Sequence, residues 1–251
     1  RAQAVIISQS PFLARRTSVA THTREVVEAA GKPVIFFADR FDYFLNQTGD
    51  GYAAKVGGAS AVCTPAMSDG FGLEPVGTIP YSLIAVSNGN TVEAAKVFTK
   101  HFPEVKLIVL VDFDNDCVNT SLEVAKALKD KLWGVRIDTA ENVKDKSLTS
   151  SKLKSQSSKL NGVNPTLVKL VRRVLDQEGF SQVKIVVSGG FNKAKVEWFE
   201  GEKAPVDLYG IGSSLVHGEN DFTADIVETG GKLISKVGRE FRPNRRLIKI
   251  N

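Results

Sequence analysis

Five short apolar runs, separated by helical patterns, constrain the fold of this chain more than any other feature of its sequence. The runs occupy residues 34–37, 107–111, 132–137, 183–187 and 206–211. Amphipathic helical patterns occupy residues 91–101, 120–129, 165–177 and 193–199, and a further helix ends near residue 30, before Gly31 and Pro33. Apolar strands that alternate with helices are typical of a parallel sheet covered by helices. The pattern therefore predicts an α/β fold, and Thr91 is the expected N-cap of the helix at 91–101.

Polar and glycine residues gather directly after these predicted strands. Asp112 follows the run at 107–111, and Asp138 follows the run at 132–137. Glycine-rich segments follow the last two runs, at residues 188–190 and 210–214. An α/β barrel builds its site at the carboxyl ends of its strands, so this arrangement favours an irregular, TIM-like barrel over an open doubly wound sheet.

Two regions and the start of the chain depart from this rhythm. Residues 144–159 are rich in Ser and Lys, which predicts a mobile loop; an active-site lid and a plain surface insertion are both open readings. Residues 224–228 and 232–236 flank Gly230-Gly231 and predict a hairpin that leaves the barrel for a separate β layer. The first residues already read like the middle of a helix, so a preceding segment is expected.

Composition disfavours several classes of protein. The net charge is +5, but acidic and basic residues are interleaved, without the Lys/Arg stripe and aromatics of a nucleic-acid module. No apolar run approaches the roughly 20 residues of a membrane span. Cys63 and Cys117 are far apart, which disfavours a disulfide scaffold or zinc site and indicates a reducing compartment. His22, His101 and His217 form no recognisable catalytic or metal motif.

The two glycine-rich segments predict a phosphate site. Glycine lets the backbone approach a phosphate closely, and successive N–H groups supply donors. The loops after the late strands of a barrel often hold phosphate in this way. The alternative is that these glycines serve only the geometry of strand-to-helix turns.

Asp112, Arg136 and Asp138 are the candidate catalytic residues. Both carboxylates are expected to face one pocket, where they would hold Mg²⁺ or ribose hydroxyls. Arg136 lies two residues before Asp138, so strand alternation sends both side chains to the same side. Its planar guanidinium suits pyrophosphate or a carboxylate. A structural ion pair at a barrel rim is the alternative.

Eight short stretches, in order along the chain, carry a family resemblance. They include Phe37-Ala38-Asp39-Arg40 and Val187-Ser188-Gly189-Gly190-Phe191. The full set occupies residues 16–21, 37–40, 56–60, 77–84, 110–112, 135–139, 187–191 and 209–213. This ordered set resembles the nicotinate phosphoribosyltransferase family, to which nicotinamide-using enzymes are related.

The resemblance implies an irregular α/β barrel beside an α/β sandwich domain. It predicts residues 1–30 as a helical segment on the sandwich side, 31–221 as the barrel, and 222–251 as a β segment returning to the sandwich. Because the family's sites lie at a dimer interface, a homodimer or higher homo-oligomer is expected, located in the cytoplasm.

The activity implied by the resemblance is phosphoribosyl transfer from phosphoribosyl pyrophosphate to nicotinate in NAD salvage. Phe37 would stack on the pyridine ring, and a neutral Ser60 would accept the nicotinate carboxylate. Arg40 and Arg136 would bind pyrophosphate or that carboxylate. Thr78 and Tyr81 complete the expected substrate-binding set.

The same resemblance assigns the ribose and phosphate contacts. Asp112 and Asp138 would hold ribose and Mg²⁺. The 5′-phosphate would lie against Ser188, Gly189, Gly190, Gly210, Gly212, Ser213 and Ser214.

One residue departs from the family pattern. Many members carry a histidine, phosphorylated by ATP, where this chain has Tyr81. A tyrosine cannot act as a phosphohistidine, so we expect transfer without ATP coupling.

Two other functions are alternatives to nicotinate phosphoribosyl transfer. One is a transferase that uses nicotinamide or quinolinate, and the other is a non-catalytic barrel that binds a phosphorylated metabolite.

Overall fold

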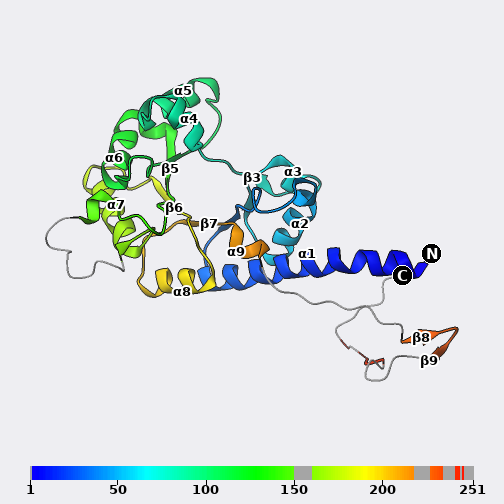
Figure 1. Ribbon diagram of the computed structural model, residues 1–251. Coiled ribbons are helices and arrows are strands. Elements are labelled where there is room, and N and C mark those ends of the chain that lie inside the picture. The colour runs from blue at the N-terminus through cyan, green and yellow to red at the C-terminus, as the bar shows by residue number, and fades with distance from the viewer. Residues whose placement is uncertain (1, 150–159, 218–226, 234–240, 244, 246–251) are drawn as a thin grey trace. The chain divides into compact units, whose positions relative to one another are not determined.

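The chain forms two compact units. The computed structural model describes residues 2–149, 160–217, 227–233, 241–243 and 245. The larger unit is Arg16–Gly218, and the smaller one combines residues 1–15 with 219–251. The larger unit carries the seven-stranded sheet (Figure 1).

Seven parallel strands make up the sheet of the larger unit, in the order β3-β2-β1-β7-β6-β5-β4. The strands are β1 Val34–Phe36, β2 Ala61–Val62, β3 Glu74–Pro75, β4 Leu107–Leu110, β5 Leu132–Ile137, β6 Lys184–Val187 and β7 Leu208–Ile211. The first and last strands are neighbours, with Val34 opposite Tyr209. This order leaves β3 and β4 as the two edges of the sheet.

The two edges of the sheet meet through the segment that follows β3. The Val76 N–H donates to the Val62 carbonyl at 2.7 Å, which extends the pairing with β2. Three residues later, the Ile79 N–H donates to the Ile108 carbonyl of β4 at 3.1 Å. The sheet therefore curls into an irregular parallel barrel, and the predicted α/β barrel is confirmed.

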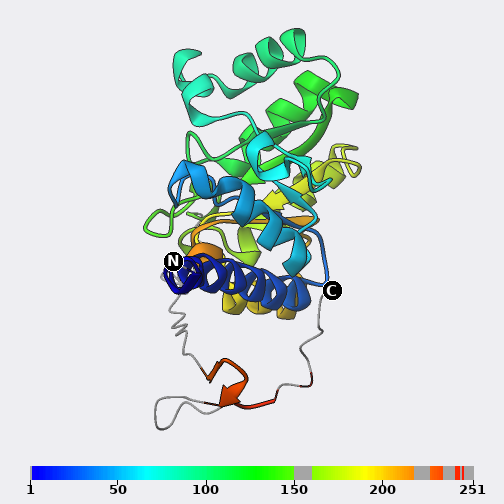
Figure 2. The same cartoon turned by 90° about the vertical axis from the view of Figure 1, so that its right-hand side faces the viewer.

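Within the larger unit, helices lie on the outside of the curled sheet, as Figures 1 and 2 show. The helices of the chain are α1 Ala2–Ala30, of which residues 16–30 belong to the larger unit, α2 Gln47–Gly57, α3 Pro65–Ser68, α4 Tyr81–Val86, α5 Thr91–His101, α6 Cys117–Leu128, α7 Pro165–Gln177, α8 Lys193–Gly201 and α9 Ser213–Val216. Short 3₁₀ turns occur at η1 Phe44–Asn46, η2 Lys129–Lys131 and η3 Lys146–Leu148. In α7, Leu167, Val171 and Leu175 recur every four residues and are fully buried, so one face of the helix packs into the hydrophobic core.

Asparagine side chains begin three of these helices. The side-chain oxygens of Asn90, Asn164 and Asn192 each accept the backbone N–H three residues ahead. Such a contact satisfies a donor that the first helical turn leaves free. The prediction of Thr91 as a cap is therefore wrong by one residue, because Asn90 holds that position.

Part of the predicted mobile loop at 144–159 is anchored instead. Asp145 is buried and accepts the Cys117 N–H at 2.9 Å, and Leu148 is fully buried. Lys144 pairs with Asn161 in an isolated antiparallel bridge. These contacts fix residues 144–148 against the loop after β4. Residues 150–159 lie outside the described part of the chain.

The smaller unit contains a short hairpin. Strand β8, Glu228–Thr229, pairs antiparallel with β9, Lys232–Leu233, around two glycines of positive φ. The hairpin is confirmed there, while its predicted outer residues 224–226 and 234–236 lie outside the described residues. The sandwich domain and the three domain boundaries stay predictions. None of the described helices combines the length and apolar character that crossing a membrane requires.

Candidate active site

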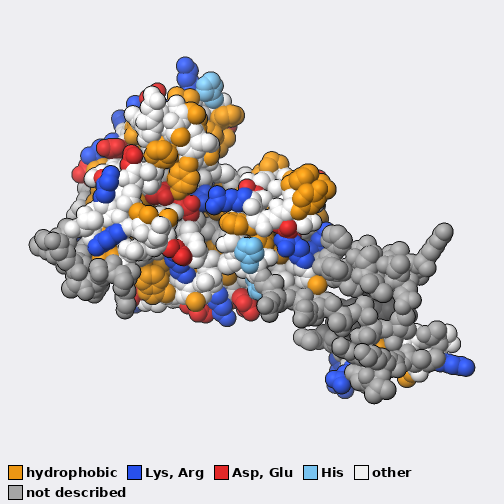
Figure 3. Space-filling view, viewed as in Figure 1, with side chains coloured by type: hydrophobic (Ala, Val, Ile, Leu, Met, Phe, Trp, Pro, Cys, Tyr) orange, Lys and Arg blue, Asp and Glu red, His pale blue; other side chains and the backbone are white. Residues whose placement is uncertain are grey.

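A cavity of about 850 Å³ lies at the carboxyl ends of the strands. All seven strands contribute a residue from the turn that follows them: Phe37, Cys63, Val76, Asp112, Asp138, Ser188 and Gly212. In the space-filling view, acidic and basic side chains lie side by side in a hollow near the middle of the face shown (Figure 3). The cavity therefore brings both signs of charge together at the end of the barrel where sites are built.

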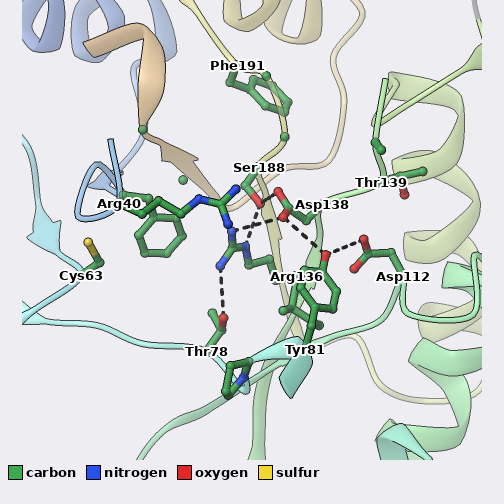
Figure 4. Close-up of a pocket in the computed structure, with 18 of the residues that line it drawn as sticks. Arg40, Cys63, Thr78, Tyr81, Asp112, Arg136, Asp138, Thr139, Ser188 and Phe191 are labelled. Carbon is green, nitrogen blue, oxygen red and sulfur yellow. Dashed lines mark hydrogen bonds and ion pairs between the residues drawn. The ribbon is translucent and has the colours of Figure 1, made fainter. Parts of the chain in front are cut away.

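Arg136 lies at the centre of a polar network in this cavity. Its Nε donates to the Ser188 hydroxyl at 2.7 Å, and one terminal nitrogen donates to the Thr78 hydroxyl at 3.1 Å. The other terminal nitrogen lies 3.6 Å from Asp138 Oδ2. The Ser188 hydroxyl in turn donates to Asp138 Oδ1 at 2.5 Å. Figure 4 shows these side chains around Arg136, so Arg136 is held in one orientation.

Phe37 lies between Arg136 and a glycine. The guanidinium of Arg136 is 4.5 Å from the centre of the Phe37 ring, a cation–π distance. A side chain at Gly210 would clash with the same ring, which explains why glycine is needed there. Protein groups therefore already contact the ring that was expected to stack on a pyridine.

Tyr81 joins the two carboxylates of the site. Its hydroxyl donates to Asp112 Oδ2 at 2.7 Å and lies 3.4 Å from Asp138 Oδ2. The expected placement of Asp112 and Asp138 at the ends of neighbouring strands is observed, since β4 pairs with β5. Burial and the two carboxylates raise the pKa of the Tyr81 hydroxyl, so it stays a hydrogen-bond donor.

Asp112 keeps one oxygen for a ligand. Burial raises its pKa to about 6, a rise that the hydrogen bond from Tyr81 opposes. Its Oδ1 is buried without a hydrogen-bond partner among the described residues. A buried acceptor of this kind is costly unless something satisfies it. A ribose hydroxyl or a cation would do so.

The described residues contain no cluster of three or more His, Cys, Asp or Glu side chains that could hold a metal. Mg²⁺, however, is commonly held by one or two carboxylates together with substrate phosphates. The pair Asp112 and Asp138, with its free oxygen, fits that kind of site.

The two glycine segments reach the cavity with their backbones. Gly189 and Gly190 have φ values of +89° and +66°, which glycine adopts at little cost. An added side chain at Gly212 would clash with the Phe37 carbonyl. Close backbone approach is therefore built into both turns.

Most predicted site residues line the cavity, but two do not. Ser60 precedes β2, is exposed, and donates its N–H to the Val34 carbonyl, so it lies at the amino end of the strand. The residue that reaches the cavity from β2 is Cys63. Ser214 donates its hydroxyl to the Phe191 carbonyl and does not line the cavity.

Sequence reasoning missed Cys63 and did not single out Asp39. The Cys63 thiol donates to Asp39 Oδ1 at 3.2 Å, and burial together with this carboxylate raises the pKa of the thiol to about 12. Strand β2 has only two residues, too few for a recognisable apolar run. Asp39 was visible as a polar residue just past β1.

Arg40 is the second cation of the cavity and is less engaged than Arg136. Its guanidinium lies 5.3 Å from the Phe41 ring, and within the described part of the chain it makes no hydrogen bond or ion pair. Figure 4 shows Arg40 extending toward the centre of the site. It is therefore available to an anionic ligand.

Comparison with known proteins relates the chain to pyridine-nucleotide enzymes. No family model matches it. A nicotinate phosphoribosyltransferase of Mycobacterium tuberculosis is 27% identical over 217 residues, which cover 84% of this chain and 43% of that relative. The chain thus spans less than half the length of this curated relative.

Solved structures include similar folds. A nicotinate-nucleotide pyrophosphorylase from Pyrococcus furiosus has a TM-score of 0.73 and 30% identity, covering 90% of this chain and 54% of that one. Human nicotinic acid phosphoribosyltransferase has a TM-score of 0.53 at 16% identity, covering 77% and 46%; at that identity the likeness concerns the fold alone. Relatives in sequence and neighbours in fold together confirm the resemblance of this chain to the nicotinate phosphoribosyltransferase family.

Proposed function

We propose that this chain forms the barrel of an enzyme that transfers phosphoribosyl from phosphoribosyl pyrophosphate to nicotinate. The products are nicotinate mononucleotide and pyrophosphate, in NAD salvage. One observation carries the proposal: a pair of carboxylates, a pair of arginines and two glycine turns line the same cavity. Mg²⁺, a homo-oligomeric state and a cytoplasmic location belong to the proposal.

The reaction needs alignment and charge more than a nucleophile. The ring nitrogen of the acceptor forms a bond to the anomeric carbon of ribose, and the bond from that carbon to pyrophosphate breaks. Positive charge develops on the sugar and negative charge on the leaving group. Preorganised groups of opposite charge stabilise such a transition state by several kcal/mol.

The charged residues divide these tasks. Asp112 and Asp138 would accept ribose hydroxyls and face the developing positive charge. They would also hold Mg²⁺, which neutralises negative charge on pyrophosphate when bound. Arg40 is the free cation and would contact the departing pyrophosphate. Arg136 keeps Asp138 and Phe37 in place, because each of its three nitrogens already has a protein partner.

The acceptor is the less constrained part of the proposal. Nicotinate is supported by the names of the relatives and by the positive charge that the two arginines bring to the cavity. Asp39 favours nicotinamide as the second candidate, because a carboxylate accepts an amide N–H and repels an acid. Quinolinate, with two carboxylates, would need more cations than the two in the described lining.

The test is formation of mononucleotide from phosphoribosyl pyrophosphate and Mg²⁺ with ATP omitted. Nicotinate, nicotinamide and quinolinate are compared as acceptors. We expect turnover with nicotinate, without ATP, because Tyr81 cannot carry a phosphohistidine. Turnover with nicotinamide alone would select the second candidate, and strict dependence on ATP would refute the expected lack of coupling. Phosphate binding without turnover would support a non-catalytic barrel.

Two arginine variants distinguish substrate binding by Arg40 from the structural role of Arg136 in the same assay. We expect Arg40→Met to raise KM for phosphoribosyl pyrophosphate about tenfold and leave the melting temperature unchanged. Arg136→Met should lower both turnover and stability, the latter by about 2 kcal/mol, because three partners lose their donor. Equal loss of stability in both variants would contradict this division.

A further inference from the structure

Lys195 lies behind the Gly189-Gly190 turn and has no role in the reaction described so far. It projects from α8, and its side chain is only 15% exposed. Its Nζ donates to the Gly189 carbonyl at 2.7 Å. Both glycines line the cavity, whereas Lys195 does not. The carbonyl of Gly189 therefore points away from the cavity, toward the lysine.

Because the peptide bond is planar, the direction of the Gly189 carbonyl also fixes the direction of the Gly190 N–H. The Gly189 carbonyl and the Gly190 N–H belong to one planar trans peptide, so they point in opposite directions. With the carbonyl held by Lys195, the Gly190 N–H is directed toward the cavity. No acceptor for this N–H is found in the part of the chain that the structure describes.

The lysine also supplies charge. A cation bound to the carbonyl polarises the peptide and strengthens its N–H as a donor. Lys195 Nζ lies 4.7 Å from the centre of the Phe191 ring and 3.9 Å from the Glu141 carboxylate. Burial lowers the pKa of Lys195, while Glu141 and Asp138 oppose that shift. The Glu141 side chain is 72% exposed, and its carboxylate lies where a side chain at Gly190 would be, so a bound anion would take its place.

We propose that Lys195 is a positioning residue that holds the Gly189–Gly190 peptide so that the Gly190 N–H binds the phosphate of a phosphorylated ligand. The inference rests on the proposed function, since it assigns the donor that would contact the phosphate of the ribose substrate. Lys195 itself stays out of contact with the ligand.

The experiment measures binding of ribose 5-phosphate and inorganic phosphate by calorimetry, with the intact chain. We expect Lys195→Met to weaken binding of both about tenfold, the effect of losing one charge-assisted hydrogen bond. Lys195→Arg should retain most of the affinity, because a guanidinium can donate to the same carbonyl. Lys193→Met is the matched control, since Lys193 is exposed on the same helix and should bind like wild type.

A second measurement uses the wild-type chain and does not depend on the folding of a variant. Titration with phosphate should shift the amide resonance of Gly190 downfield. Unchanged affinity in Lys195→Met, or an unmoved Gly190 resonance in a chain that binds phosphate, would overturn the role of Lys195 alone. Absence of phosphate binding in wild type would remove both this role and the phosphate part of the proposed function.

Discussion

At the scale of single residues, the burial of Asp112 links the site to the stability of the protein. The pKa of this carboxyl is about 6 in the folded chain, against 3.8 ordinarily. The folded state therefore holds the proton more tightly than the unfolded state. Ionisation costs folding free energy, and the cost grows as pH rises from about 4 to about 6 and is fully present above.

Asp112→Asn tests this cost. An amide oxygen can still accept from Tyr81, but no charge is buried. We expect the variant to be more stable than wild type at pH 8, by on the order of 2 kcal/mol, and to match it near pH 4. Turnover should be lost. Denaturant unfolding at both pH values makes the comparison; a variant less stable than wild type at pH 8 would mean that the ionised carboxylate stabilises the fold.

The sequence identified much of the site at this scale because strand ends are recognisable. Asp112, Arg136 and Asp138 follow or close long apolar strands, and alternation fixes their side. Ser60 illustrates the limit. It was placed by family resemblance, but the two-residue strand β2 puts it at the wrong end and brings Cys63 to the cavity. Contacts such as that of Lys195 with Gly189 depend on a loop conformation that no spacing reveals.

At the scale of elements, the close packing of helix α2 on helix α3 depends on Gly51. A side chain at Gly51 would lie 2.0 Å from the backbone oxygen of Met67. Backbone on both sides leaves little room to adjust. Gly49 lies in the same helix, but its nearest neighbour is the flexible end of Arg16.

The substitutions Gly51→Ala and Gly49→Ala should therefore have opposite effects. We expect Gly51→Ala to destabilise the fold by about 2 kcal/mol through overpacking. Gly49→Ala should be neutral or stabilising by up to about 1 kcal/mol, since alanine favours a helix and Arg16 can move. Thermal unfolding of both variants decides this; similar changes in the two would show that α2 and α3 can separate without cost.

Long elements were predictable and short ones were not. The helices at 91–101 and 165–177 were predicted with their observed bounds, because each has a wide apolar face and a clear end. Strands β2 and β3 have two residues each and give no periodic signal. Parallel pairing of these strands comes from their neighbours in the sheet, not from their own sequence.

At the scale of the whole molecule, the barrel has one weak seam. Strands β3 and β4 are the sheet edges, and among described residues one backbone hydrogen bond closes the gap between them, from Ile79, in the segment after β3, to Ile108 of β4. By contrast, Val135 lies in β5, which pairs with strands on both sides. Opening the seam breaks fewer backbone hydrogen bonds than separating β5 from its neighbours.

Native-state hydrogen exchange should detect this difference. We expect the Ile79 amide to exchange at least about tenfold faster than that of Val135, although both residues are fully buried. Ribose 5-phosphate should slow exchange at Ile79, because a ligand on Thr78 and Asp112 would bridge the seam. Equal protection of the two amides would show that the barrel is closed as firmly there as elsewhere.

The seam also divides the groups that line the cavity between two parts of the chain. The part before β4 supplies Arg40, Thr78 and Tyr81, and the part from β4 onward supplies Asp112, Arg136 and Asp138. A ribosome makes the first part before the second, and each part alone holds one of the two arginines that line the cavity. A chain still being synthesised would thus lack the assembled cavity, because neither part carries all of the groups that line it.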